Sequence, residues 1–190
     1  MKKIYLLLAV LFIQSNVFSQ MEEDGWYLSF GVNAINNLGT QSPINSPDDW
    51  YFNSVPATLS AEFNWAGNFS IEPSLSYNQI KSGKSLDGGQ LDKDYDYIAL
   101  DTHVKYYFGK FLLPKSNRIE VYANAGLGFF HIDETNISAN VGGGILFWLS
   151  DKKNIALRAQ TISKFAFNHP KSGFDNNHFL YNLQLVFKMN

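Results

Sequence analysis

The residues best suited to chemistry are charged side chains of both signs that recur within weakly polar, alternating segments. They are Glu62, Glu72, Asp101, Lys105, Glu120 and Arg158. Charges withdrawn from water are costly unless acid and base pair. If the segments enclose a narrow lumen, we expect Glu62, Glu72, Lys105, Glu120 and Arg158 to form one salt-bridged layer, with Asp101 and His103 lying further along it. The alternative is that lumen water solvates each charge separately.

Catalytic and metal-binding candidates are weaker. Nucleophilic catalysis would need a histidine beside a serine, and the candidates are His131, His169 and His178 with Ser138 and Ser163. No G-x-S-x-G sequence occurs. His169, Asp175 and His178 match no standard zinc spacing. We therefore expect no catalytic residue, no metal and no cofactor.

A third group of residues could recognise a ligand. The sequence SPDDWYFNSVP places two acids beside three aromatics, and these five are Asp48, Asp49, Trp50, Tyr51 and Phe52. Aromatic side chains are enriched where proteins contact partners. The alternative, which we favour, is that Trp50, Tyr51 and Phe52 anchor this segment on a rim or in a lipid interface.

The elements that must position these residues are strands. Within Asn68–Ile80, apolar and polar residues alternate from Phe69 to Asn78, which predicts a strand with two different surroundings. Eight such segments occur, at residues 26–35, 57–66, 68–80, 95–108, 118–130, 138–149, 155–167 and 179–189. Their usual length exceeds the ordinary strand length of about 5–6 residues and suits a tilted membrane crossing. Aromatic residues gather near the segment ends, as expected at two membrane interfaces.

The connecting segments alternate in length. Longer polar ones cover residues 36–56, 81–94, 131–137 and 168–178, and shorter ones cover 67–68, 109–117 and 150–154. Long loops outside and short turns in the periplasm are typical of outer-membrane barrels. The pattern predicts an all-β, eight-stranded antiparallel up-and-down transmembrane β-barrel over residues 20–190, with both termini periplasmic.

The chain begins with a predicted secretory signal peptide, residues 1–19. Lys2 and Lys3 precede a run of ten apolar residues, too short to span a bilayer as a helix. Without these two lysines, 13 basic residues face 17 acidic ones, so the chain has no basic footprint for nucleic acid. It also contains no cysteine.

The segments GWYLSFGVNAINN, NFSIEPSLSYN and GGGILFWLSDKKNIALRAQTISKF resemble OmpA/OmpX-type small outer-membrane barrels, particularly those of Bacteroidetes. The chain stops after the eighth segment, so the resemblance implies no peptidoglycan-binding domain. It implies a structural or surface-interaction (adhesion) protein, expected to be monomeric, in contact with outer-membrane lipid and with an unknown surface ligand. A lipid-modifying enzyme and a soluble exported all-β binding module are the alternatives.

Pro73 conflicts with this architecture. A closed barrel has no edge strand for a residue that cannot donate to the ladder. The sequence therefore predicts a β-bulge or one missing ladder bond at Pro73.

Overall fold

The computed structural model describes residues 25–37, 50–52, 55–65, 68–86, 89–167 and 177–189. The predicted signal peptide, Asp48, Asp49, His169 and Asp175 lie outside these ranges. Among the described residues, no helix is long and apolar enough to cross a membrane.

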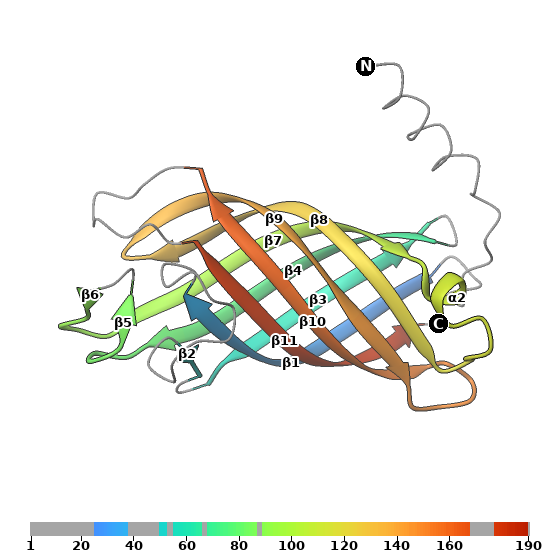
Figure 1. Ribbon diagram of the computed structural model, residues 1–190. Coiled ribbons are helices and arrows are strands. Elements are labelled where there is room, and N and C mark those ends of the chain that lie inside the picture. The colour runs from blue at the N-terminus through green and yellow to red at the C-terminus, as the bar shows by residue number, and fades with distance from the viewer. Residues whose placement is uncertain are drawn as a thin grey trace, which may run out of the picture.

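Eight long strands form a closed barrel (Figure 1). They are β1 (Gly25–Asn37), β3 (Ala57–Asn64), β4 (Phe69–Ile80), β7 (Tyr95–Tyr107), β8 (Ile119–Ile132), β9 (Glu134–Trp148), β10 (Ile155–Ala166) and β11 (His178–Met189). Each pairs antiparallel with its neighbours, and β11 pairs back onto β1 from Trp26↔Met189 to Asn37↔His178. The predicted eight-stranded antiparallel barrel is confirmed, with every strand near its expected position.

The barrel has two different ends. The turn end carries the 65–68 connection, the 149–154 turn and a short helix, α2 (Gly109–Leu112). The loop end carries two small additions, β2 (Trp50–Tyr51), which pairs with β1, and the hairpin of β5 (Ser85–Leu86) and β6 (Gly89–Gln90). In Figure 1, α2 lies at the right and β2, β5 and β6 lie at the left.

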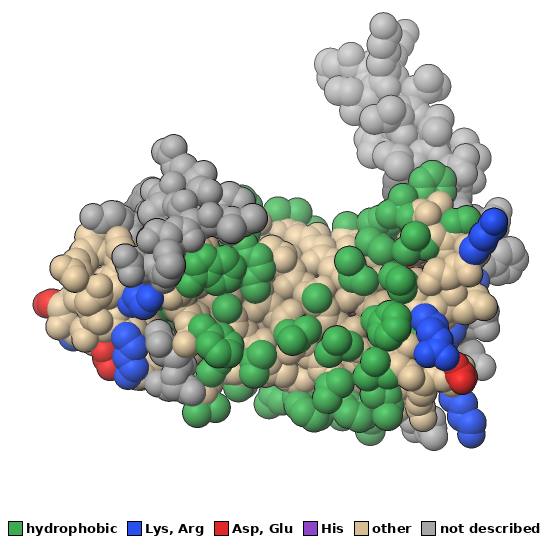
Figure 2. All heavy atoms as spheres, turned by 60° about the horizontal axis from the view of Figure 1, so that its bottom comes forward, with side chains coloured by type: hydrophobic (Ala, Val, Ile, Leu, Met, Phe, Trp, Pro, Cys, Tyr) green, Lys and Arg blue, Asp and Glu red, His purple; other side chains and the backbone are tan. Residues whose placement is uncertain are grey.

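Successive side chains of each strand point alternately to the outer wall and into the lumen. Large apolar side chains point outward, so Phe30 is 52% and Leu127 is 61% exposed, and Figure 2 shows apolar side chains spread along the wall. An apolar outer surface of this extent fits a lipid environment. The inward positions are buried and many are polar, including Ser70, Asn78 and Gln184.

The third predicted loop, residues 131–137, is wrong. Strand β8 continues to Ile132, β9 begins at Glu134, and the reversal takes place at Asp133, whose φ is 61°. Alternation in fact persists through this segment, because Ile132 and Asn136 are both buried on the inner face. The polar composition suggested a loop, but the period of two carries both strands beyond it.

The ladder break predicted at Pro73 is confirmed. Between β3 and β4, pairing stops after Ser60↔Ser74 and resumes at Phe63↔Ile71 in the same register. The break is therefore a missing bond and not a bulge. On the other side, pairing with β7 continues through Pro73↔Thr102. The absent N–H of Pro73 points toward β3, and a groove of about 480 Å³ lies over this position on the lipid-facing wall, lined by Ala61, Pro73 and neighbouring residues.

Candidate functional site

Four charged side chains meet in the middle of the lumen. Lys105 Nζ lies 2.9 Å from Glu62 Oε2 and 2.7 Å from Glu72 Oε2. Arg158 Nη2 lies 2.5 Å from the same Glu62 oxygen, and Arg158 Nη1 pairs with Glu72. All four side chains are buried. Two acids and two bases give this charge cluster zero formal charge, as a low-dielectric interior requires.

The charge cluster spans the lumen. In the circular strand order, Glu62 and Glu72 lie on adjacent strands β3 and β4, whereas Arg158 projects from β10 on the opposite wall. Arginine suits this role because its planar guanidinium can contact both carboxylates at once.

Hydroxyl groups complete the charge cluster. Ser70 Oγ and Tyr107 Oη each donate to Glu62 Oε1 over 2.6 Å, and Ser60 Oγ donates to Glu72 Oε2 over 3.1 Å. The Lys105 ammonium also lies 4.7 Å from the centre of the Tyr122 ring. Buried carboxylates are stable only when their lone pairs are satisfied, so these donors are part of the site.

A second buried ion pair lies nearer the loop end. Lys164 Nζ is 2.6 Å from Asp101 Oδ1, which also accepts from Asn140 Nδ2 over 2.8 Å. His103 Nε2 lies 3.4 Å from the same Asn140 amide. Asp101 and His103 were expected beyond the charge cluster, and the structure places them there. Lys164 was not expected as the partner of Asp101, although Lys164 shares the inward parity of Arg158.

Glycines on β8 and β9 make room for these large side chains. A Cβ on Gly144 would lie 2.5 Å from the Tyr122 hydroxyl oxygen and 2.6 Å from the Ala159 carbonyl oxygen. A Cβ on Gly128 would collide with Asp101. These inward-facing glycines therefore leave space in the lumen for side chains from the neighbouring strands.

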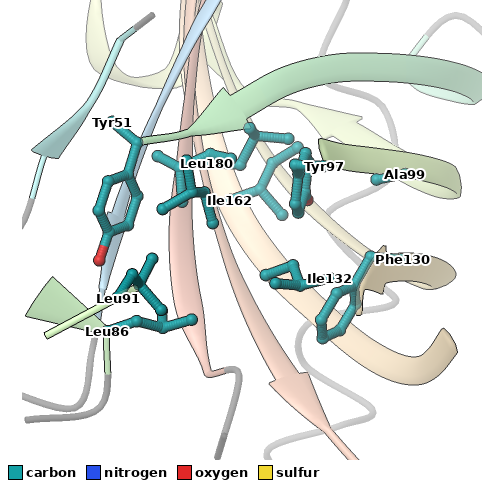
Figure 3. Close-up of a cluster of buried hydrophobic side chains, with 11 residues drawn as sticks. Tyr51, Leu86, Leu91, Tyr97, Ala99, Phe130, Ile132, Ile162 and Leu180 are labelled. Carbon is teal, nitrogen blue, oxygen red and sulfur yellow. The ribbon is translucent and has the colours of Figure 1, made fainter. Parts of the chain in front are cut away.

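Apolar layers lie on both sides of the charged groups. Toward the turn end, the buried layer is Tyr27, Tyr107, Tyr122, Leu146, Trp148, Ala156 and Val186. Toward the loop end, Tyr51, Leu86 and Leu91 pack on barrel residues that include Tyr97, Phe130 and Leu180 (Figure 3). The lumen is therefore apolar at these two levels. Leu146 and Trp148 interrupt the polar face of β9 because they build the first layer.

Glu120 does not join the charge cluster. It is buried at the turn end, beside Gly109 of α2, where a Cβ on that glycine would meet its carboxylate. Lys105 and Arg158 instead contact Glu62 and Glu72. Four of the five residues that were expected in one layer therefore form the charge cluster. The alternation correctly predicts that Glu120 faces inward. Counting residues does not give its position along the barrel axis, because barrel shear shifts neighbouring strands along that axis.

The aromatic group of the first loop holds the rim. Tyr51 is fully buried in the barrel mouth, and its hydroxyl group donates to the Ser85 carbonyl oxygen. Trp50 packs against Tyr181, with 4.9 Å between ring centroids. Phe52 is 59% exposed. Trp50 and Tyr51 therefore make the anchoring contacts of the alternative reading, and Phe52 is the described member that remains accessible.

The second loop is held by a surface ion pair. Lys81 Nζ lies 2.8 Å from Asp94 Oδ2, and the Ser82 backbone N–H donates to the other oxygen of Asp94. The hydrogen bond from Lys81, followed by that from Ser82, lowers the pKa of Asp94 below its ordinary value.

The histidine and serine candidates do not assemble a catalytic pair among the described residues. His131 is exposed, and its Nδ1 lies 3.2 Å from Thr135 Oγ1, whereas Ser138 points inward and donates to Asn140. His178 is buried at the start of β11, with Nε2 2.9 Å from the Tyr97 hydroxyl oxygen. Within the described ranges, no group of three or more histidine, cysteine or acidic residues could hold a metal ion.

Comparisons with solved structures support the fold. Ail of Yersinia pestis, determined in complex with the heparin analogue sucrose octasulfate, superimposes with a TM-score of 0.55 at 12% identity, covering 88% of this chain and 99% of Ail. Neisserial surface protein A gives 0.58 at 12% identity, covering 87% and 97%. OprG from Pseudomonas aeruginosa gives 0.56 at 13% identity, covering 90% and 99%. At these identities the likeness shows the fold alone.

Sequence comparison identifies the family. No curated protein matches the chain significantly. The family model of the outer membrane protein beta-barrel domain matches residues 5–187, which is nearly the whole chain. Together with the closed barrel and its apolar outer wall, this match argues against the alternative of a soluble exported all-β binding module. The chain belongs to the outer membrane protein beta-barrel domain family, whose members lie in the outer membrane of Gram-negative bacteria.

Proposed function

We propose that this protein is a sealed, non-catalytic outer-membrane barrel that acts through its loop end in a structural or surface-interaction role. The observation that carries the proposal is the charge cluster of Glu62, Glu72, Lys105 and Arg158, which crosses the lumen between two buried apolar layers. An eight-stranded barrel is just wide enough for side chains to fill, so such a cluster leaves no path for solutes. The ends of the barrel must then carry the function.

The charge of the loop end indicates the class of surface ligand. The four segments expected as loops contain eight acidic residues and four basic ones. Ail was crystallised with a polysulfated ligand. This acidic loop end instead suits a cationic or uncharged partner, since like charges repel. Phe52 lies at the loop end, and Phe52 remains a candidate binding residue together with Asp48 and Asp49 of the same sequence segment.

The proposed orientation places the loop end outside the cell and both termini in the periplasm, as a monomer whose residues 1–19 have been removed. The resemblance to OmpA/OmpX-type barrels supports this arrangement, and the alternation of short turns with long loops agrees with it. The lipid-modifying alternative is less well supported, since His131 contacts Thr135 and His178 contacts the Tyr97 hydroxyl group.

Cysteine labelling in intact cells tests where the protein acts, because the chain has no cysteine of its own. A membrane-impermeant maleimide should label Ser82→Cys, at the loop end, and leave Asn117→Cys, at the turn end, unlabelled. Cells that produce the protein should bind no more fluorescent heparin than cells without it. Labelling of Asn117→Cys alone, or protein-dependent binding of heparin, would refute the proposal.

A further inference from the structure

The helical turn at the turn end exposes apolar side chains. Phe111 is 73%, Leu112 53% and Leu113 37% exposed. Lysines flank them on both sides, at Lys110 and Lys115. Three consecutive exposed apolar residues are unfavourable in water, and their position between lysines is typical of a segment that lies in a membrane interface.

An aromatic row connects this segment to the lipid-facing wall. Ring centroids lie 6.4 Å apart for Trp65 and Phe69, 4.9 Å for Phe69 and Tyr106, and 6.4 Å for Tyr106 and Phe108. Phe108 immediately precedes α2. Tryptophan and tyrosine concentrate at the level of lipid headgroups, so the row places α2 at that level.

The connecting segment before β8 and the turn after β9 are both basic. The described residues 109–118 and 149–154 contain five basic side chains, which are Lys110, Lys115, Arg118, Lys152 and Lys153. Asp151 is their one acidic residue, and it pairs with Arg118. A backbone hydrogen bond of 2.7 Å from Trp148 N to Arg118 O ties the two turns together. Figure 2 shows basic side chains gathered at the end of the molecule that carries α2 in Figure 1.

The two turns also enclose a polar pocket. It has a volume of about 400 Å³ and is lined by Asn117, Arg118, Ser150, Asp151 and Lys153. Asn117 and Arg118 of this pocket belong to the same connecting segment as Phe111, Leu112 and Leu113. A phosphate in the pocket could therefore contact its basic groups while the attached acyl chains follow the apolar wall. The basic charge of the two turns and the adjoining lipid-facing surface thus both favour an anionic lipid as the occupant.

We propose that these two turns form a site for the headgroups of anionic phospholipids, of the phosphatidylglycerol class, in the leaflet at the turn end. Phe111, Leu112 and Leu113 insert among the acyl chains, and the surrounding lysines contact phosphate groups. Basic residues close to an anionic membrane surface each add to the attraction. The site anchors the barrel at a fixed depth and is independent of whether the lumen is sealed.

Spin-labelled phosphatidylglycerol and phosphatidylcholine, compared by electron spin resonance on the barrel in phosphatidylcholine bilayers, test the site. We expect wild type to prefer phosphatidylglycerol. The triple variant Lys110→Gln, Lys115→Gln, Lys152→Gln should lower this preference about fivefold or more. Lys153 is left unchanged because its φ is 52°.

The matched control removes three lysines from the loop end, Lys81→Gln, Lys84→Gln and Lys93→Gln. It changes the net charge equally, and the loop end meets the same lipid in a symmetric bilayer, so the preference should stay at the wild-type value. Heat-modifiable gel mobility verifies that both variants are folded. Absence of a preference in wild type would overturn the site and leave the turns to another partner, such as an acidic protein. An equal loss in both triple variants would overturn it by showing a general charge effect.

Discussion

Replacing Arg158 by methionine is the most informative single perturbation of the lumen. Arg158 is 1% exposed and contacts Glu62 and Glu72 from the opposite wall, with an additional hydrogen bond of 3.3 Å from Nη1 to Ser29 Oγ. Methionine retains much of the side-chain volume and removes the charge. Two buried carboxylates would then share Lys105 alone, and the lumen would carry one uncompensated negative charge.

The size of the effect distinguishes a dry lumen from a wet one. Removing one partner of a buried ion pair costs about 3–5 kcal/mol, because the remaining charge stays desolvated. If water filled the lumen, it would solvate the carboxylates and the cost would fall to about 0–1 kcal/mol, as for exposed pairs. We expect Arg158→Met to lower the free energy of unfolding by the larger amount.

A second substitution should restore part of the loss. In the double variant Arg158→Met, Glu72→Gln, the remaining charges are Glu62 and Lys105, which balance. The loss of unfolding free energy in the double variant should therefore be smaller than the sum of the losses in the two single variants, by about 0.5–3 kcal/mol. Arg118→Met is the matched control, since Arg118 pairs with Asp151 at the surface, where the two side chains are 52% and 87% exposed.

Urea unfolding of the refolded barrel in detergent micelles, followed by tryptophan fluorescence and by gel mobility, measures these differences. Equal losses of stability in Arg158→Met and Arg118→Met, or additive effects of Arg158→Met and Glu72→Gln, would show that the lumen charges are not desolvated and coupled.

Three further predictions concern single positions. Pro73→Val supplies the missing donor to β3, so unfolding should require about 0.5–1.5 kcal/mol more; a loss of stability would contradict the missing-bond account. Gly144→Ala should cost about 1–3 kcal/mol through overpacking, whereas Gly89→Ala, whose Cβ would approach no atom closer than 3.7 Å, should be neutral. The Asp94 pKa is depressed, so its contact with Lys81 contributes at neutral pH and is lost as pH falls through that pKa. Lys81→Gln should raise the Asp94 pKa in an NMR titration, and an unchanged value would refute this link.

The fold could be predicted because a strand in a barrel wall has a period of two. The inward parity of Glu62, Glu72, Lys105 and Arg158 followed from that period, as did the outward parity of their apolar neighbours. Strand ends were less accessible, since polar residues occur both in loops and on the inner face. The segment after His131 shows this ambiguity.

The heights of residues in the lumen could not be predicted by counting. Shear displaces neighbouring strands along the axis, so Glu120 lies beside α2 and Lys164 reaches Asp101. The apolar layers had a visible signal in Leu146 and Trp148, which break the polar parity of β9. Their partners become recognisable only when all eight strands are placed around one lumen.

Ion conductance of the wild-type barrel in a planar lipid bilayer tests the central claim most directly. The charge cluster and the two apolar layers predict that insertion of folded protein leaves the conductance at the level of the protein-free bilayer. Stable, discrete conducting steps that depend on folded wild-type protein would show that the lumen is open and would contradict the account.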